Sequence, residues 1–114
     1  MIRDCKTKEH LQQITQTSHQ EPVFLLKHST RCPISAAAWR SFQEYARAHA
    51  DQQLWRVLVV EQRDTSSHIA RETGIAHQSP QILLFHKGDV VWHASHWSIT
   101  EDAMAAALSQ IAAG

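Results

Sequence analysis

Three continuous runs of four apolar residues constrain the fold of this chain most strongly. They are Val23–Leu26, Val57–Val60 and Ile82–Phe85, and a polar residue follows each of them. Runs of this kind are typical of central strands that are covered on both faces. The segments between the runs have helical spacing, so the order predicts a parallel strand pair with a right-handed crossover.

A long helix is expected directly after the first run. Pro33 suits its first position, because the missing N–H of proline would have no intrahelical partner there. One face of this helix is formed by Ile34, Ala38, Phe42, Tyr45 and His49. The other expected helices are Thr7–Thr15 with Thr7 as N-cap, Thr65–Thr73 ended by Gly74, and a last one after a capping box at Ser98–Glu101, with Met104, Ala107, Leu108 and Ile111 as its buried stripe.

The end of the chain adds an antiparallel pair of strands. Residues 82–86 and 90–94 flank the turn Lys87-Gly88-Asp89, which predicts a hairpin. The expected element order is therefore α-β-α-β-α-β-β-α, a mixed four-stranded sheet flanked by helices, which is the thioredoxin-like α/β arrangement. The length of 114 residues predicts a single domain over residues 1–114.

Composition narrows the range of partners and compartments. Acidic and basic residues number 11 each, so the zero net charge argues against nucleic acid or an anionic membrane as a partner. The apolar runs are too short to span a membrane, and the polar start Met1–Lys6 lacks the apolar core of a signal peptide. Two cysteines cannot make a disulfide framework. We therefore expect a reducing, cytoplasmic environment.

Cys32 lies at the junction between the first expected strand and the long helix. The positive end of a helix favours the thiolate, which is the reactive form of cysteine. Dithiol redox proteins carry a second cysteine three residues further on, and here that position is Ser35. The pattern predicts one-thiol exchange chemistry, with Ser35 as a hydrogen-bond partner of the Cys32 sulfur. The alternatives are a buried structural cysteine and an ordinary hydroxyl in the first turn of a helix.

Two further residues bear on this interpretation. Pro80 follows Ser79 directly before the third apolar run, where a proline serves a turn or the start of a strand. Sequence alone leaves its peptide isomer open. Cys5 lies near the terminus beside Lys6, and we interpret it as an incidental thiol rather than a resolving one.

Histidines near these segments raise the question of a metal site. His93 and His96 are three residues apart, and residues at that spacing on a strand point to opposite faces. We therefore expect no metal site there. His28 ends the first strand four residues before Cys32, where it is either a neighbour of the thiolate or a solvated loop histidine.

Four segments, taken in order, resemble the YtxJ-type monothiol bacilliredoxins of the bacillithiol redox system. The segments are Phe24–Thr30, Cys32–Ser35, Ser79–Gln81 and Val91–Trp97. The resemblance implies a thioredoxin fold and a cytosolic enzyme that removes bacillithiol from S-thiolated client proteins. It also implies that Cys32 is the reactive cysteine and that Pro80 is cis. Bacillithiol would act as a co-substrate, with no tightly bound cofactor. The residues expected to bind the substrate are Thr30, Arg31, Pro33, Ser79 and Pro80.

Two rival functions remain at this stage. Some monothiol glutaredoxins hold an iron–sulfur cluster between two subunits, and thiolate ligation makes this chemically possible for Cys32. Pro33, however, stands where such motifs carry a glycine after the cysteine. The other rival is a thioredoxin-like binding module without catalysis, because one fold hosts many functions.

Overall fold

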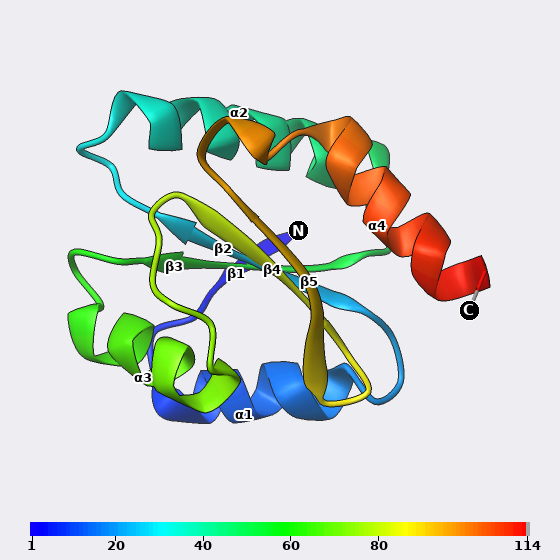
Figure 1. Ribbon diagram of the computed structural model, residues 1–114, viewed down its shortest axis with the longest axis horizontal. Coiled ribbons are helices and arrows are strands. Elements are labelled where there is room, and N and C mark those ends of the chain that lie inside the picture. Colours follow the sequence, from blue (N-terminus) through cyan, green and yellow to red (C-terminus); the bar gives the residue numbers. More distant parts are fainter. Residues whose placement is uncertain (114) are drawn as a thin grey trace.

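The protein folds as one mixed β-sheet between two layers of helices, as seen in a computed structural model that describes residues 1–113 (Figure 1). The elements in chain order are β1 (Ile2–Asp4), α1 (Lys8–Thr17), β2 (Val23–His28), α2 (Pro33–Ala48), β3 (Gln53–Leu58), α3 (Arg63–Thr73), β4 (Gln81–His86), β5 (Asp89–Ser95), the 3₁₀ turn η1 (His96–Ser98) and α4 (Glu101–Ala113). The predicted thioredoxin-like architecture is confirmed, with one strand more than predicted.

The sheet has the strand order β1-β3-β2-β4-β5. β1, β3 and β2 run parallel, whereas β4 is antiparallel to both of its neighbours, β2 and β5. The additional strand β1 is only three residues long and adds to the edge at β3. Its sequence Ile-Arg-Asp has no apolar run, so only its pairing with β3 makes it a strand.

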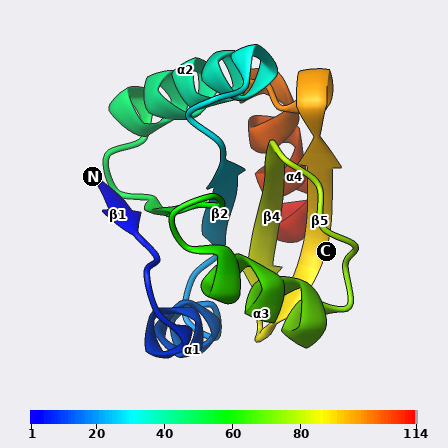
Figure 2. The ribbon, with the colours of Figure 1, turned by 90° about the vertical axis from the view of Figure 1, so that its left-hand side faces the viewer.

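Helices α2 and α4 cover one face of the sheet, and α1 and α3 cover the other (Figures 1 and 2). All six residues of β2 are buried, as expected for a central strand between two helical layers. Its side chains alternate between the two faces. Phe24 and Leu26 pack with α2 and α4, while Val23 and Leu25 pack with α1 and α3.

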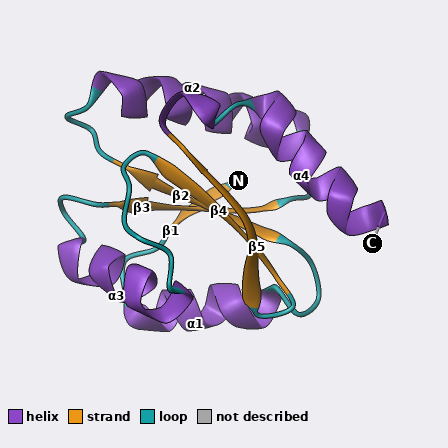
Figure 3. Cartoon of the chain, viewed as in Figure 1, coloured by secondary structure: helices purple, strands orange, loops and turns teal. Residues whose placement is uncertain are grey.

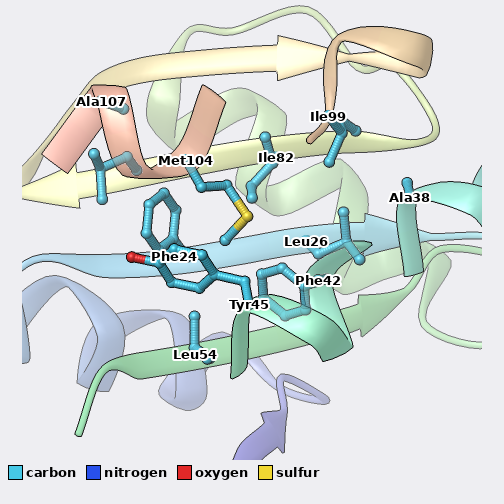
Figure 4. Packing of buried hydrophobic residues seen from close by; sticks show 11 residues of the cluster. Phe24, Leu26, Ala38, Phe42, Tyr45, Leu54, Ile82, Ile99, Met104 and Ala107 are labelled. Atoms are coloured by element: carbon cyan, nitrogen blue, oxygen red, sulfur yellow. The ribbon is translucent and has the colours of Figure 1, made fainter. Parts of the chain in front are cut away.

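The core under α2 and α4 is aromatic and aliphatic (Figure 4). Phe42 and Tyr45 of α2 lie in one cluster with Phe24 of β2, and Met104 of α4 packs into the same cluster. The rings of Phe24 and Tyr45 meet edge to face at 5.6 Å between centroids. This contact fixes α2 against the central strand, and with it the position of the residue that precedes α2, Cys32.

Two predicted helix ends are confirmed by their hydrogen bonds. The Thr7 side chain accepts a hydrogen bond from the His10 N–H at 3.1 Å, which caps α1. Gly74 ends α3 with φ of 71°, in the left-handed region that glycine adopts without steric cost.

Two predicted boundaries were wrong. The third strand of the sheet is Gln53–Leu58 and not Val57–Val60, because the ladder with β2 pairs Val23 with Gln53 and ends at His28 opposite Leu58. The last helix is capped by Thr100, whose hydroxyl accepts from the Ala103 N–H at 3.1 Å, and not by Ser98. Burial of Ile99 in the core places the start of the helix directly after it, and Ser98 belongs to η1.

Several loops meet at one end of the sheet, where β2 and β3 end and β4 begins (Figure 3). The register places Lys27 beside Gln81, and Gln81 beside Ser95. The segment that leads to Cys32, the segment that carries Pro80 and the turn η1 therefore leave the sheet at neighbouring points.

No helix within residues 1–113 combines the length and the apolar character needed to cross a bilayer.

Candidate active site

Cys32 occupies the N-cap position of α2 in extended conformation, with φ of −112° and ψ of 123°. Its carbonyl accepts the first hydrogen bond of the helix, from the Ala36 N–H at 3.1 Å, and Pro33 opens the helix as predicted. The Cys32 residue is partly exposed, and Thr30, Arg31 and Pro33 around it are exposed. The unpaired N–H groups of the first helical turn therefore lie next to an accessible sulfur.

The predicted hydrogen bond between Ser35 and the Cys32 sulfur is absent from residues 1–113, which the structure describes. Its side chain is fully buried, and its Oγ accepts from the Ser29 N–H at 2.8 Å. Because Ser29 lies in the loop between β2 and α2, this bond closes the loop that presents Cys32. Ser35 therefore stabilises the conformation of the loop between β2 and α2.

The Ser79–Pro80 peptide bond is cis. Pro80 is buried, and its carbonyl accepts from the His96 N–H at 3.0 Å, which joins the segment to η1. Neither the backbone N–H nor the carbonyl of Ser79 is hydrogen-bonded to another described residue. The backbone of Ser79 is thus free to pair with an extended chain next to the site.

A family model places these features in context. The model for the monothiol bacilliredoxin BrxC matches residues 3–104. The chain belongs to the monothiol bacilliredoxin family. A solved thioredoxin-fold structure described as an oxidoreductase is 32% identical to it, with a TM-score of 0.86 over 94% of this chain and 93% of that one. The family and this neighbour identify the protein as a thiol–disulfide oxidoreductase.

Two more distant structures bear only on the fold of this family member. The thioredoxin of Malassezia sympodialis is 20% identical with a TM-score of 0.74, covering 96% of this chain and 90% of its own. The thioredoxin of Trypanosoma brucei brucei is 15% identical with a TM-score of 0.77, covering 100% of this chain and 93% of its own.

The second cysteine of this bacilliredoxin is unsuited to exchange chemistry. Cys5 is 1% exposed and packs in the core with Leu11, Ile14 and Trp55. Burial raises the pKa of the Cys5 thiol to about 12, so the thiolate is scarcely populated at neutral pH. This burial on the α1 and α3 side of the sheet agrees with the interpretation that Cys5 does not act as a resolving cysteine.

His28 is buried rather than solvated, so the loop-histidine interpretation was wrong. Its ring stacks on Trp39 of α2, with 5.2 Å between centroids and an interplanar angle of 16°. Burial lowers the pKa of His28, and the nearby charge of Arg56 lowers it further, while Glu61 opposes the shift. A neutral His28 under α2 therefore packs as an aromatic ring.

The histidines of the β5 segment do not gather other ligands. His93 is exposed on β5, and His96 lies in η1 with φ of 55°. Within residues 1–113 no group of three or more histidine, cysteine or acidic side chains is arranged to hold a metal ion.

One residue near the site was missed by sequence reasoning. Lys27 is fully buried in β2, directly before His28, and its amine lies 3.2 Å from Nδ1 of His77. The available signal was a lysine that directly continues an apolar run. The sequence periodicity predicts the face of the sheet on which this lysine lies. Its partner His77, 50 positions away, is brought to it only by the tertiary fold.

Proposed function

We propose that this enzyme removes bacillithiol, or a closely similar small thiol, from S-thiolated proteins through a mixed disulfide on Cys32. The observation that carries the proposal is the contrast between the two thiols. Cys32 is accessible at the start of α2, whereas Cys5 is buried in the core. One accessible thiol without a neighbouring second one matches exchange that depends on an external thiol.

The first half-reaction transfers the small thiol. The Cys32 thiolate attacks the bacillithiol sulfur of the client's mixed disulfide, forming one S–S bond while the old one breaks. The client cysteine leaves as a thiolate and takes up a proton from solvent. Cys32 now carries the bacillithiol, and the number of disulfide bonds is unchanged.

The second half-reaction restores the enzyme. A second bacillithiol thiolate attacks the sulfur of the bacillithiol held on Cys32 and releases the Cys32 thiolate together with bacillithiol disulfide. The hydroxyl of Ser35 cannot replace this external thiol, because it forms no S–S bond. Cys32 leaves from the N-cap position of α2, where the positive end of a helix favours a departing anion.

The surrounding residues hold the reactants. The unpaired backbone of Ser79 pairs with an extended client segment as an added strand, and cis-Pro80 shapes the wall behind it. Exposed Thr30 and Pro33 line the approach to the sulfur, and Arg31 adds an exposed positive charge that favours an anionic small thiol. The reducing cytoplasm is the compartment in which such a free thiol persists.

The identity of the small thiol is tested with one peptide carried as three mixed disulfides, with bacillithiol, glutathione or cysteine. Release of the peptide thiol is followed under single-turnover conditions. We expect the bacillithiol form to react fastest. Equal rates for all three would remove bacillithiol from the proposal, and no release from any of them would remove the exchange reaction itself.

A variant with Ser35 replaced by cysteine tests the placement of both positions at the start of α2. Ser35→Cys puts a second thiol three residues after Cys32, and we expect an internal disulfide on mild oxidation. Alkylation followed by peptide mapping reads the result. Two alkylatable thiols at 32 and 35 after oxidation would contradict the geometry, and Ser35→Ala serves as the control without a second sulfur.

A further inference from the structure

Lys27 carries a buried amine at the site end of the sheet. It is fully buried in β2, where it pairs with Gln81 at the start of β4 and with Val57 of β3. Burial lowers the pKa of Lys27 to about 8, so the amine is still mostly protonated at neutral pH. A buried cation destabilises a fold unless its partners compensate, so its presence calls for a reason beyond packing.

The partner of this amine is His77. The Lys27 Nζ lies 3.2 Å from His77 Nδ1, and the Ser66 hydroxyl of α3 lies 3.5 Å from the same nitrogen. Lys27 is a donor when charged, so His77 Nδ1 must be the acceptor. This arrangement requires a neutral His77 with its proton on Nε2. Partial desolvation of the ring and then the charge of Lys27 lower the pKa of His77, although the residue as a whole is exposed.

His77 belongs to the segment that delivers cis-Pro80 to the site. This segment, residues 75–80, has no helix or strand of its own. A second bond holds it to the sheet, from Gln81 Nε2 to the Ala76 carbonyl at 3.2 Å. Lys27 and Gln81 are neighbours in the ladder, so two adjacent buried side chains fix two adjacent residues of the segment.

We propose that Lys27 is a positioning residue, which acts through His77 to hold residues 75–80 in the conformation that offers Ser79 and Pro80 to the client. This inference rests on the proposed function of the site. Lys27 does not touch the reacting sulfur in this account. It sets the binding surface, whereas Cys32 carries the chemistry.

Replacement of Lys27 by methionine separates positioning from structure. Methionine has a similar length and removes the charge, so Lys27→Met is expected to keep or raise thermal stability. The kcat/KM for the bacillithiolated peptide is expected to fall about tenfold, mainly through KM, because the client surface is no longer held. The rate of Cys32 alkylation by iodoacetamide is expected to stay unchanged.

His77 provides a matched series of variants, in which the comparison of His77→Ala with His77→Asn also stands without Lys27→Met. His77→Ala removes the acceptor and is expected to raise KM as strongly as Lys27→Met, with no further rise in the double variant. His77→Asn places an oxygen close to the position of Nδ1 and is expected to restore most of the loss. His93→Ala, an exposed histidine on β5, is the control that leaves KM unchanged.

A readout without turnover distinguishes this inference from the proposed function. The backbone order parameters of Gln78 and Ser79, measured by ¹⁵N relaxation, are expected to fall in Lys27→Met, and the pKa of His77, followed by NMR, is expected to rise. His77 Nδ1 faces the charged amine of Lys27 and the neutral hydroxyl of Ser66, whereas Arg63 and Asp64 at the start of α3 are exposed.

Each outcome of these experiments decides one of the two proposals. Unchanged order parameters at Gln78 and Ser79 in Lys27→Met and in His77→Ala, or an unchanged KM in an active enzyme, would overturn the inference on Lys27. If wild-type protein released no thiol from any mixed disulfide, the proposed function would fail, and the NMR data would still decide whether Lys27 holds the segment.

Discussion

Replacing Cys32 by serine is expected to abolish release of the small thiol from a thiolated client, with a loss on the order of a thousandfold or more. The hydroxyl of serine cannot form the mixed disulfide on which both half-reactions depend. The fold is expected to remain intact, because Cys32 makes no side-chain cap and is partly exposed. The measurement is the single-turnover release of the peptide thiol, alongside the thermal midpoint of each protein.

Cys5→Ser is the matched control for this experiment. It removes the other thiol of the chain, which is 1% exposed and packed in the core. We expect release to stay near the wild-type rate, with a loss of stability of about 1–3 kcal/mol from burying a hydroxyl. Residual release by Cys32→Ser that disappears in the double variant would assign the reaction to Cys5 and contradict the account.

The largest expected effect on stability comes from Phe42. Its side chain is fully buried between α2 and the sheet and stacks against Trp39, with 6.3 Å between centroids. Phe42→Ala is expected to lower the free energy of unfolding by about 3–5 kcal/mol, because it loses buried apolar area and leaves a cavity. This is a large part of the roughly 5–15 kcal/mol that stabilises a typical domain.

Urea denaturation measures this effect, with the exposed Arg40→Ala on the same helix as control. The control is expected to change stability by less than about 0.5 kcal/mol. A loss below about 1 kcal/mol for Phe42→Ala would show that α2 does not depend on this contact. A looser α2 would also be expected to slow thiol exchange, because Cys32 is the N-cap residue of this helix.

Central elements of the fold were predictable because burial leaves a strong pattern. The runs that became β2 and β4 are apolar on both faces, and Pro33 and Gly74 mark helix ends by their backbone geometry. The strand β3 was shifted because an apolar run gives burial but not register. Ladder pairing with β2 decided that register.

The same distinction holds for the site. The positions of Cys32 at a strand-to-helix junction and of Pro80 before a strand were predictable from local sequence, whereas the cis isomer of Pro80 was implied only by the family resemblance. The partner of Ser35 is Ser29, and that of Lys27 is His77. Loop closure and tertiary packing determine these partners, so no local sequence pattern predicts them.

The central claim is that Cys32 itself receives the small thiol. Wild-type protein is mixed with one equivalent of bacillithiolated peptide, without free bacillithiol, quenched with acid and analysed by intact mass and peptide mapping. The account predicts a bacillithiol adduct on Cys32 with Cys5 unmodified. Release of the peptide thiol while Cys32 stays unmodified would contradict it.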